Sequence, residues 1–477
     1  MGNMTLMGGE IVLALGAVLL LLVGVFGGKN GVSIVRYISI TALLVFAFSG
    51  FVLNGKGEAF GGAFISDGFS HYVKALVGLT AAASLWFSRS WFKAEKLDQF
   101  EYSILMLFSV LGMGIMVSSG NLLTMYIGLE MQALSLYVMA AFNRDSLRAS
   151  EAGLKYFVLG ALSSGILLYG LSLIYGFTGV LSFDKIGAAL SGVDHINAGL
   201  VAGLVFVLAG LAFKISAAPF HMWTPDVYEG APTPVTGFFA GAPKLAALAL
   251  IARLITGPFA GMAHDWQQVL IVLAVLSMVI GAFGALTQTN IKRLMGYSSI
   301  ANMGYALVPL AAGGAAGVGG MLIFMSIYLV TIVGLFAAIL QMRTRDGAVE
   351  GIADLAGLSK SNLPLSLILT ALMFSIAGIP FFMGFFGKWF AFAPAFNAGL
   401  SWLVVVALLS SVVAAFYYLR VIKVIWFDEK ARDFIKAPTS LAILSTLSAL
   451  LLFPVLLLPM VTVPVRALIE AAATSLF

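Results

Sequence analysis

The stretch FKISAAPFHMWTPDVYEGAPTPVTGFFAGAPKLAALALIA, residues 213–252, decides the fold. Most of it is apolar enough to lie in a membrane, yet it carries Lys214 and Lys244 on either side of a centre rich in Pro and Gly. Proline lacks a backbone donor and clashes with the preceding turn, so Pro219 predicts a helix broken soon after Lys214. Unwound backbone at membrane depth is tolerated only inside protein or beside water. The stretch therefore predicts a membrane protein with a polar interior.

Similar apolar runs extend in both directions from this stretch. Of the 477 residues, 61% are hydrophobic and 10% are charged, whereas a soluble domain is about 25% charged. A crossing takes roughly 20 apolar residues. Fourteen runs meet that need, namely 10–27, 32–53, 68–88, 101–119, 121–142, 150–176, 198–217, 234–256, 267–287, 293–312, 319–342, 363–396, 399–425 and 438–461. The chain is therefore predicted to be an all-α polytopic membrane protein with one domain, 1–477.

The distribution of Lys and Arg predicts the orientation. With the N-terminus outside, seventeen of these residues fall in inner loops and flanks, four in outer segments and five within spans. The outer ones are Lys56, Lys185, Arg253 and Arg466, and those within spans are Lys74, Lys155, Lys214, Lys244 and Lys388. A miscounted span would reverse the side of every later loop, so this bias supports fourteen spans and two outer termini.

A second break is predicted in the twelfth span, at SIAGIPFFMGFFGKW, residues 375–389. Interrupted helices at corresponding positions of two halves are typical of inverted repeats with function at the break. We therefore expect a first repeat over spans four to eight, 101–256, and a second over spans nine to thirteen, 267–427. A three-helix segment, 1–100, precedes them, and a C-terminal helix within 438–477 follows.

Four ionisable residues lie deep in predicted spans: Glu130, Lys214, Lys244 and Lys388. Each charge at a helix centre costs roughly 2.5–3.5 kcal/mol, so four unpaired ones would cost on the order of 10 kcal/mol. They must pair, lose their charge or line hydrated cavities. A lysine beside a movable carboxylate can gain and lose a proton, so the set predicts a proton relay. The plainer alternative is that the charges only hold helices together.

Other polar residues have secondary or structural interpretations. Lys74 and Lys155 can extend their ammonium groups to a membrane interface. His221 beside the first break is a candidate for a proton branch, because a histidine titrates near neutral pH. We expect Asp226, Tyr228 and Glu229 to serve loop and capping roles. The chain has no Cys and four scattered His residues, His71, His195, His221 and His264, so we expect no cofactor or metal on it.

Several segments resemble the antiporter-like membrane subunits of respiratory complex I, the proton-translocating NADH–quinone oxidoreductase. They are FKISAAPFHMWTPDVYEGAPTPVTGFFAGAPK with SIAGIPFFMGFFGKW, both quoted above, ALSLYVMAAFNRDSLRASEAGLKYFVLGALSSGILLYG (133–170) and NIKRLMGYSSIANMGY (290–305). The likeness runs from about span four to span thirteen. The segment GFFGKW places Lys388 where other branches of this family tend to carry Glu. The chain therefore resembles the branch that carries Lys at this position.

The resemblance implies a role for each buried charge. Glu130 matches the fifth-helix glutamate that partners the lysine of the broken helix, and Lys214 matches that lysine. Lys244 matches the connecting lysine of the eighth helix, and Lys388 matches the twelfth-helix residue toward the exit or the next subunit. Lys155 matches a further lysine of the family. The sequence departs from the family at Asn302, where a His is usual, and after Pro380, where a second proline is usual.

The resemblance also implies a function and a setting. The chain would move protons through its buried Glu and Lys, driven by quinone reduction elsewhere in the complex. NAD, FMN, iron–sulfur clusters and quinone would be bound by other subunits. Its partners would be neighbouring membrane subunits, including an antiporter-like one, and lipids, in a bacterial inner membrane. The alternatives are a subunit of a multi-subunit sodium/proton antiporter and a structural scaffold.

Overall fold

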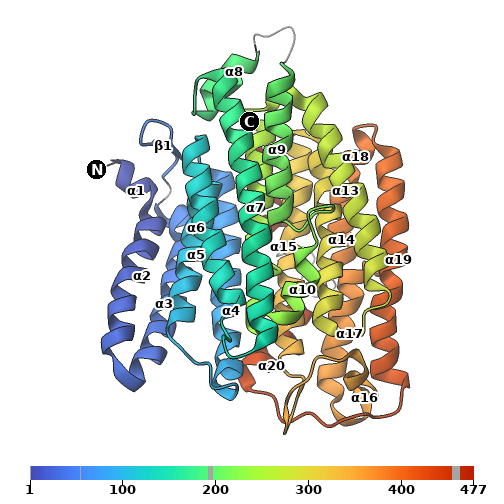
Figure 1. Ribbon diagram of the computed structural model, residues 1–477. Coiled ribbons are helices and arrows are strands. Elements are labelled where there is room, and N and C mark those ends of the chain that lie inside the picture. Colours follow the sequence, from blue (N-terminus) through green and yellow to red (C-terminus); the bar gives the residue numbers. More distant parts are fainter. Residues whose placement is uncertain (1, 54, 192–196, 454–461) are drawn as a thin grey trace.

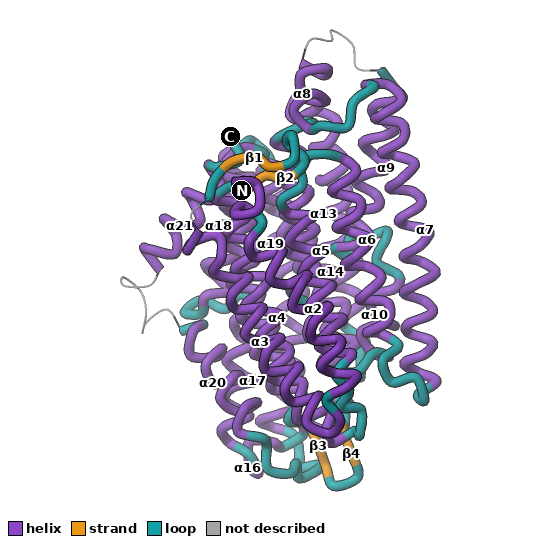
Figure 2. Tube along the Cα trace, turned by 90° about the vertical axis from the view of Figure 1, so that its left-hand side faces the viewer, coloured by secondary structure: helices purple, strands orange, loops and turns teal. Residues whose placement is uncertain are grey.

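The computed structural model describes the whole chain apart from residues 1, 54, 192–196 and 454–461. Long helices run side by side in one bundle, and both termini lie at its upper end in Figure 1. The view turned by 90° shows short connections, with β1 and β2 at the upper end and β3 and β4 at the lower end (Figure 2). Eight helices in the described part are long and apolar enough to cross a membrane.

Each predicted span coincides with a helix or with consecutive helices. In chain order these are α2 (Gly8–Phe26), α3 (Gly28–Leu53), α4 (Gly68–Ala94), α5 (Glu101–Val117), α6 (Leu122–Ala140), α7 (Leu147–Thr178), α9 (Ala198–Lys214), α11 (Thr233–Phe239) with α12 (Ala242–Thr256), α13 (Ala263–Ala285), α14 (Ile291–Ala312), α15 (Gly314–Ile339), α17 (Leu363–Ala377) with α18 (Met383–Asn397), α19 (Ser401–Phe427) and α20 (Thr439–Leu451). Shorter elements are α1 (Gly2–Leu6), β1 (Gly57–Ala59), β2 (Phe64–Ser66), α8 (Phe183–Ser191), α10 (Trp223–Gly230), η1 (Ala260–Met262), β3 (Arg343–Thr344), β4 (Gly347–Ala348), η2 (Ile352–Leu355), α16 (Leu358–Ser361) and α21 (Thr462–Thr474).

Both predicted helix breaks are confirmed. The first separates α9, whose last residue is Lys214, from α10. The second separates α17 from α18, and there Gly378 takes φ 85°, a left-handed conformation that glycine adopts without a steric penalty. One proline and its neighbouring glycines are therefore sufficient for the second break, without the second proline that is usual in the family.

The helices of the first repeat approach one another closely where small residues meet. A Cβ atom on Gly112 of α5 would lie 2.6 Å from the carbonyl oxygen of Gly128 of α6. In the second repeat, a Cβ on Gly281 of α13 would lie 2.4 Å from the backbone nitrogen of Ala301 of α14. Without a side chain at these points the backbones can touch, as is common between membrane helices. Each repeat therefore begins with a tightly packed helix pair.

The C-terminal span is shorter than predicted. Helix α20 ends at Leu451, and a separate helix, α21, packs on α4 and α15. Pro454 and the rest of the predicted span 438–461 lie outside the described residues. The prediction of one helix over 438–461 is therefore wrong after Leu451, since Leu452 and Phe453 are not helical.

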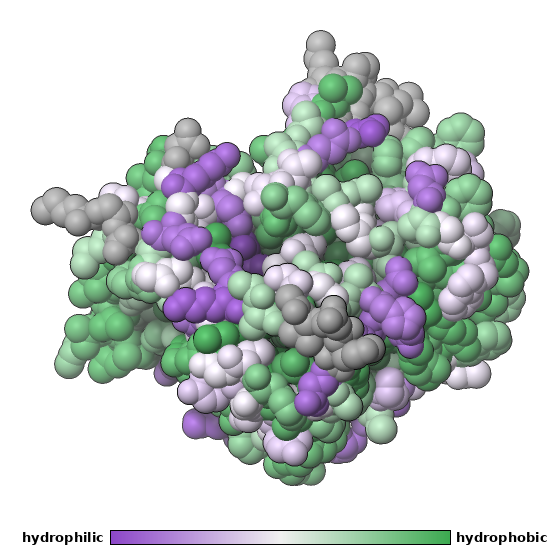
Figure 3. Space-filling model, turned by 90° about the horizontal axis from the view of Figure 1, so that it is seen from above, coloured by the Kyte–Doolittle hydropathy of each residue, from purple (hydrophilic) through white to green (hydrophobic). Residues whose placement is uncertain are grey.

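The bundle exposes apolar side chains around its circumference, such as Leu123 at 56% and Val412 at 71% exposure. Figure 3 looks down on the upper end, where hydrophilic side chains lie on the end face and hydrophobic ones form much of its edge. This arrangement is that of a protein surrounded by lipid.

Candidate functional site

Glu130, Ser164 and Lys214 form a connected group in the first repeat. Ser164 of α7 donates a hydrogen bond to the Glu130 carboxylate on α6. Lys214 Nζ lies 3.4 Å from Ser164 Oγ and 3.2 Å from the hydroxyl of Tyr137, and it is 7% exposed. Because Lys214 is the last residue of α9, its positive charge also lies at the negative end of that helix dipole. At the first break, a single serine hydroxyl therefore lies between the Lys214 ammonium and the Glu130 carboxylate.

Glu130 itself is only partly buried, so the expectation that all four charges are buried is wrong for this residue. Helix α6 turns an apolar face outward, on which Ile127 and Leu134 are 49% and 53% exposed. Glu130 follows Ile127 by three residues and precedes Leu134 by four, so it borders this face. The sequence shows depth along a helix but not which way the helix faces.

Aromatic rings from the first break separate Lys214 from Lys244. Lys214 Nζ lies 5.8 Å from the ring of Phe213, which lies 5.4 Å from that of Trp223. Trp223 in turn lies 6.4 Å from Tyr228, whose ring is 5.2 Å from Lys244 Nζ. A cation over an aromatic face is stabilised by the ring quadrupole. The two lysines are thus linked by rings rather than by hydrogen bonds.

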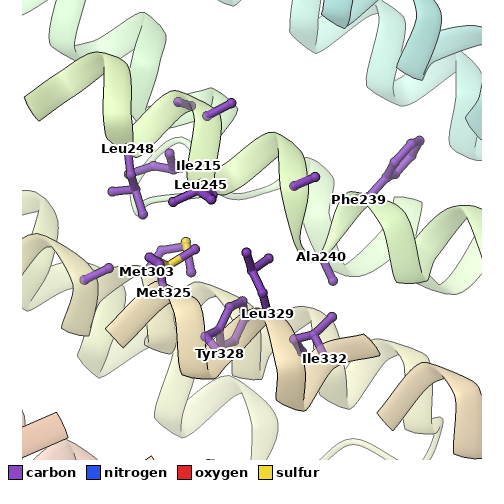
Figure 4. Packing of buried hydrophobic residues seen from close by; sticks show 14 of the residues in the cluster. Ile215, Phe239, Ala240, Leu245, Leu248, Met303, Met325, Tyr328, Leu329 and Ile332 are labelled. Carbon is purple, nitrogen blue, oxygen red and sulfur yellow. The ribbon is translucent and has the colours of Figure 1, made fainter. Parts of the chain in front are cut away.

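Lys244 connects the two repeats. It is 1% exposed, and its Nζ donates a 2.6 Å hydrogen bond to Ser299 of α14. Ser299 Oγ lies 2.9 Å from the hydroxyl of Tyr328 on α15. Buried apolar side chains lie beside this contact, and Leu245 and Leu248 of α12 face Met303 of α14 and Met325 of α15 in Figure 4. Lys244 therefore makes a polar contact among buried apolar side chains.

We call Glu130, Lys214, Lys244 and Lys388, with the hydroxyl groups that contact them, the row. Lys388 lies at its far end, in α18 just after the second break. It is 7% exposed, donates to Ser411 at 2.7 Å and to the Ala377 carbonyl at 2.9 Å, and lies 4.9 Å from the ring of Tyr305. A cavity of about 20 Å³ is lined by Tyr328, Asn302, Thr331, Ser375 and Lys388, among others. Such a cavity has room for about one water. A single water can therefore stand between Tyr328 and Lys388.

Lys155 lies within α7, inside the predicted span 150–176, and its side chain reaches polar partners. Its side chain is 41% exposed near the lower end of α7, and it pairs with Glu151 at 2.7 Å and Asp226 at 2.8 Å. Asp226 and Glu229 of α10 both accept from Arg293 of α14. These ion pairs hold the half-helix after the first break against the second repeat.

The network continues to Glu350, in the loop after β4. Glu350 accepts from Lys292 at 2.8 Å and from Arg148 at 3.1 Å. Burial alone would raise the pKa of Glu350, but the ammonium of Lys292 and the guanidinium of Arg148 outweigh it and leave the pKa below its usual 4.5. Glu350 is therefore ionised at neutral pH and ties both repeats together at the lower end.

The structure does not bring His221 into the row. It is partly buried at the first break, and its buried Nδ1 has no hydrogen-bond partner among the described residues. Tyr228, for which a loop role was expected, is instead fully buried beside Lys244. Asn302 lines the water-sized cavity and donates to the Ser298 carbonyl at 2.8 Å. His195 lies outside the described residues.

The sequence analysis missed the uncharged members of the row, Ser164, Ser299, Tyr328 and Ser411. Serine occurs in most of the predicted spans, so these positions carry no signal of their own. Only their distance from a lysine on another helix distinguishes them. In the described ranges, no three His, Cys, Asp or Glu side chains gather closely enough to hold a metal ion.

Known proteins are similar to nearly the whole chain. A family described as "NADH:quinone oxidoreductase/Mrp antiporter, TM" matches residues 119–414. NADH-quinone oxidoreductase subunit N of Maricaulis maris is 54% identical over 452 residues, covering 94% of each chain. A chain of respiratory complex I from Thermus thermophilus superposes with a TM-score of 0.82 at 33% identity, covering 96% of this chain and 98% of that one. A chain of the Mrp complex from Dietzia reaches 0.85 at 20% identity, covering 99% and 97%, which shows a shared fold.

Proposed function

Because the chain belongs to the subunit N family of NADH-quinone oxidoreductase, we propose that it carries protons across a bacterial inner membrane along the row from Glu130 to Lys388. The observation that carries this proposal is the series of polar contacts on both sides of the two helix breaks. Buried ionisable residues in a membrane are costly and mark ion or proton pathways. The termini would then lie on the outer side, in keeping with the bias of Lys and Arg toward the other end.

The first step takes place between Glu130 and Lys214. Ser164 bonds both side chains, so a change of charge at one is transmitted to the other through a single hydroxyl. When Lys214 is positive it stabilises the Glu130 carboxylate, and when Glu130 is protonated or moves away that support is lost. Lys214 then releases its proton toward Lys244.

The second step passes the aromatic rings of Phe213, Trp223 and Tyr228. Among the described residues, no side-chain hydrogen bond joins Lys214 to Lys244, and these rings lie between them. A proton needs water there, and water enters only if a ring turns aside. These rings would therefore act as a gate. They would stop a proton from passing between Lys214 and Lys244 unless Lys214 has just released it.

The third step passes from Lys244 to Lys388. An ammonium is a donor only, whereas a hydroxyl can accept one proton while donating another. Ser299 and Tyr328 can thus hand a proton from Lys244 to the cavity beside Lys388. Lys388 would deliver it toward the exit or to a neighbouring membrane subunit of the complex, with lipids around the bundle.

The energy would come from quinone reduction elsewhere in the complex, where NAD, FMN, iron–sulfur clusters and quinone would be bound. The role of this chain is then electrostatic. A change of charge or position at Glu130 starts the sequence, and re-formation of the Glu130–Lys214 contact ends it.

The deciding experiment replaces Lys214 by Met in the assembled complex. We expect the subunit to remain in the complex and NADH-driven proton pumping to fall. Lys360→Met, at an exposed lysine of α16, is the matched control and should leave pumping unchanged. Normal pumping by the Lys214→Met variant would refute the role of Lys214. Loss of assembly in both Lys214→Met and Lys244→Met would favour the scaffold alternative.

The sodium/proton antiporter remains the alternative function. The likeness to the Mrp complex is at 20% identity and concerns the fold. Transport that requires sodium in the purified complex would favour this alternative, whereas pumping that continues without sodium would argue against it.

A further inference from the structure

A second pair of buried opposite charges lies outside the row, among the N-terminal helices. Glu10 in the first turn of α2 and Lys74 of α4 form an ion pair of 2.6 Å, with side chains 4% and 7% exposed. Both lie toward the upper end, where α2 and α4 begin. Replacing a buried ion pair by apolar side chains is often neutral or stabilising. Stability alone therefore gives no reason for charges at this place.

His71 belongs to the same cluster. Its Nε2 lies 2.8 Å from Ser66 Oγ, and Ser66 donates its one hydroxyl proton to the Gly55 carbonyl at 2.7 Å. The proton in the contact between His71 and Ser66 must therefore sit on Nε2. That leaves Nδ1 as the nitrogen that takes up or releases a proton. His71 precedes Lys74 by three residues, so the two side chains share one face of α4.

The backbone leaves space around this cluster. A cavity of about 10 Å³ is lined by Glu10, His71, Lys74 and Ser66, among others, and its size is at the limit for one water. A Cβ on Gly9 would lie 2.4 Å from Ser49 Oγ, and a Cβ on Gly50 would lie 2.6 Å from Cδ2 of His71. Side chains at these two positions would close the space that the cluster occupies.

Few other charges act on His71. Besides Lys74 and Glu10 they are Asp67 and Lys56. Asp67 caps α4 and is held by Arg253 of α12 through both carboxylate oxygens, at 3.0 and 2.8 Å. The residues that α3 and α5 place against the cluster, Ser49, Gly50 and Gly114, are uncharged.

We propose that Glu10, Lys74 and His71 form a proton-binding site, separate from the row, that exchanges with the aqueous phase at the upper end. His71 takes up the proton. A positive His71 repels Lys74, which lies on the same helix, and attracts Glu10 of α2, so proton uptake adds a second attraction between α2 and α4. The next step rests on the proposed function, in which the upper end faces the compartment that receives pumped protons. The site then responds when protons accumulate in that compartment.

Hydrogen–deuterium exchange of the assembled complex tests this site. Protection of the first turns of α2 and α4 is compared at about pH 8 and about pH 5.5, on either side of the usual histidine range, after correction for the intrinsic exchange rate. We expect about a tenfold gain of protection at the lower pH in the unaltered protein, the change in equilibrium that about 1.4 kcal/mol of added attraction produces. His71→Gln can keep the contact with Ser66 but takes up no proton, so its protection should not change with pH.

The matched control is His264→Gln, at an exposed histidine in the first turn of α13, which should keep the full response. The double variant Glu10→Gln/Lys74→Met lacks both charges and should also show no response. A pH response that persists in His71→Gln, or its absence from the unaltered protein, would overturn the proposal. Since the measurement needs no pumping, its result is independent of whether the row from Glu130 to Lys388 carries protons.

Discussion

Lys244 of the first repeat donates a 2.6 Å hydrogen bond to Ser299 of the second, within otherwise apolar packing. Ser299 has a single proton, and a charged lysine accepts none, so the serine must direct its own proton elsewhere. The hydroxyl of Tyr328 lies 2.9 Å away and is placed to receive it. The contact between the repeats therefore has a direction, from Lys244 toward Lys388.

Ser299→Ala should interrupt the row without changing its charge. A hydrogen bond to a charged group contributes about 1.5–3 kcal/mol, so we expect proton pumping to fall by about tenfold or more. Pumping in proteoliposomes is the measurement. The neighbouring Ser298 bonds Tyr418 rather than Lys244, so Ser298→Ala is the control and should pump normally. Equal pumping by both variants would contradict a path through Ser299.

Two tyrosines near Lys244 should differ in their effect. The hydroxyl of Tyr328 is 2.9 Å from Ser299, whereas that of Tyr228 is 3.5 Å away, at the limit of a hydrogen bond. We expect Tyr328→Phe to lower pumping several-fold and Tyr228→Phe to leave it nearly unchanged, because phenylalanine keeps the ring over Lys244. The ratio of protons moved to NADH oxidised would reveal the difference, and a larger loss in Tyr228→Phe would reverse this assignment.

The features predicted from the sequence were those with a strong local cause. Pro219 and Gly378 lie at the two breaks, where proline or glycine weakens a helix, and a lysine in an apolar run is conspicuous. Partners contributed by other helices were not predictable, as Ser299 shows, because nothing near it in the sequence refers to Lys244. Glu10 was missed because an acidic residue in a first helical turn is ordinary. Lys155 lies in the predicted helix, but its partner Asp226 on α10 could not be inferred from the sequence around it.

Glu350→Gln should weaken the lower end of the bundle. It leaves Lys292, whose side chain is 2% exposed, without its carboxylate partner. Loss of one partner of a buried pair costs about 3 kcal/mol. Thermal unfolding of the detergent-solubilised complex at neutral pH is the measurement.

The ion pair between Glu350 and Lys292 also predicts that the stability of the folded protein depends on pH. Because the folded pKa of Glu350 lies below its usual 4.5, its stabilising contribution is present above that value and is lost as the pH falls through the lower folded pKa. The difference in stability between the unaltered protein and Glu350→Gln should therefore shrink in acid. A difference that stays constant down to about pH 3 would argue that the pair contributes through packing alone.

Gly384→Ala should disrupt the second break. A Cβ at Gly384 would lie 1.7 Å from the carbonyl oxygen of Ser375, which is backbone and cannot turn aside. We expect more than about 3 kcal/mol of destabilisation, in the range of severe core changes, and loss of the subunit from the complex. Gly16→Ala in α2, with no atom within 4 Å of the added carbon, is the control and should assemble normally. Normal assembly of Gly384→Ala would mean that α17 and α18 can separate freely.

Asn302 offers a test of the water between Tyr328 and Lys388. Its side chain lines the cavity of about 20 Å³ and is fixed by a 2.8 Å hydrogen bond to the Ser298 carbonyl. An amide does not change its charge, so Asn302 can hold a water but cannot relay a proton through its own ionisation. Asn302→Leu puts an apolar group of larger volume into the cavity, and we expect pumping to fall several-fold as the water is displaced. Asn302→Ala enlarges the same space and leaves room for water, so its pumping should stay near normal. If Asn302→Ala were as impaired as Asn302→Leu, the amide itself would be required, and a water filling the cavity would not be enough to connect the two residues.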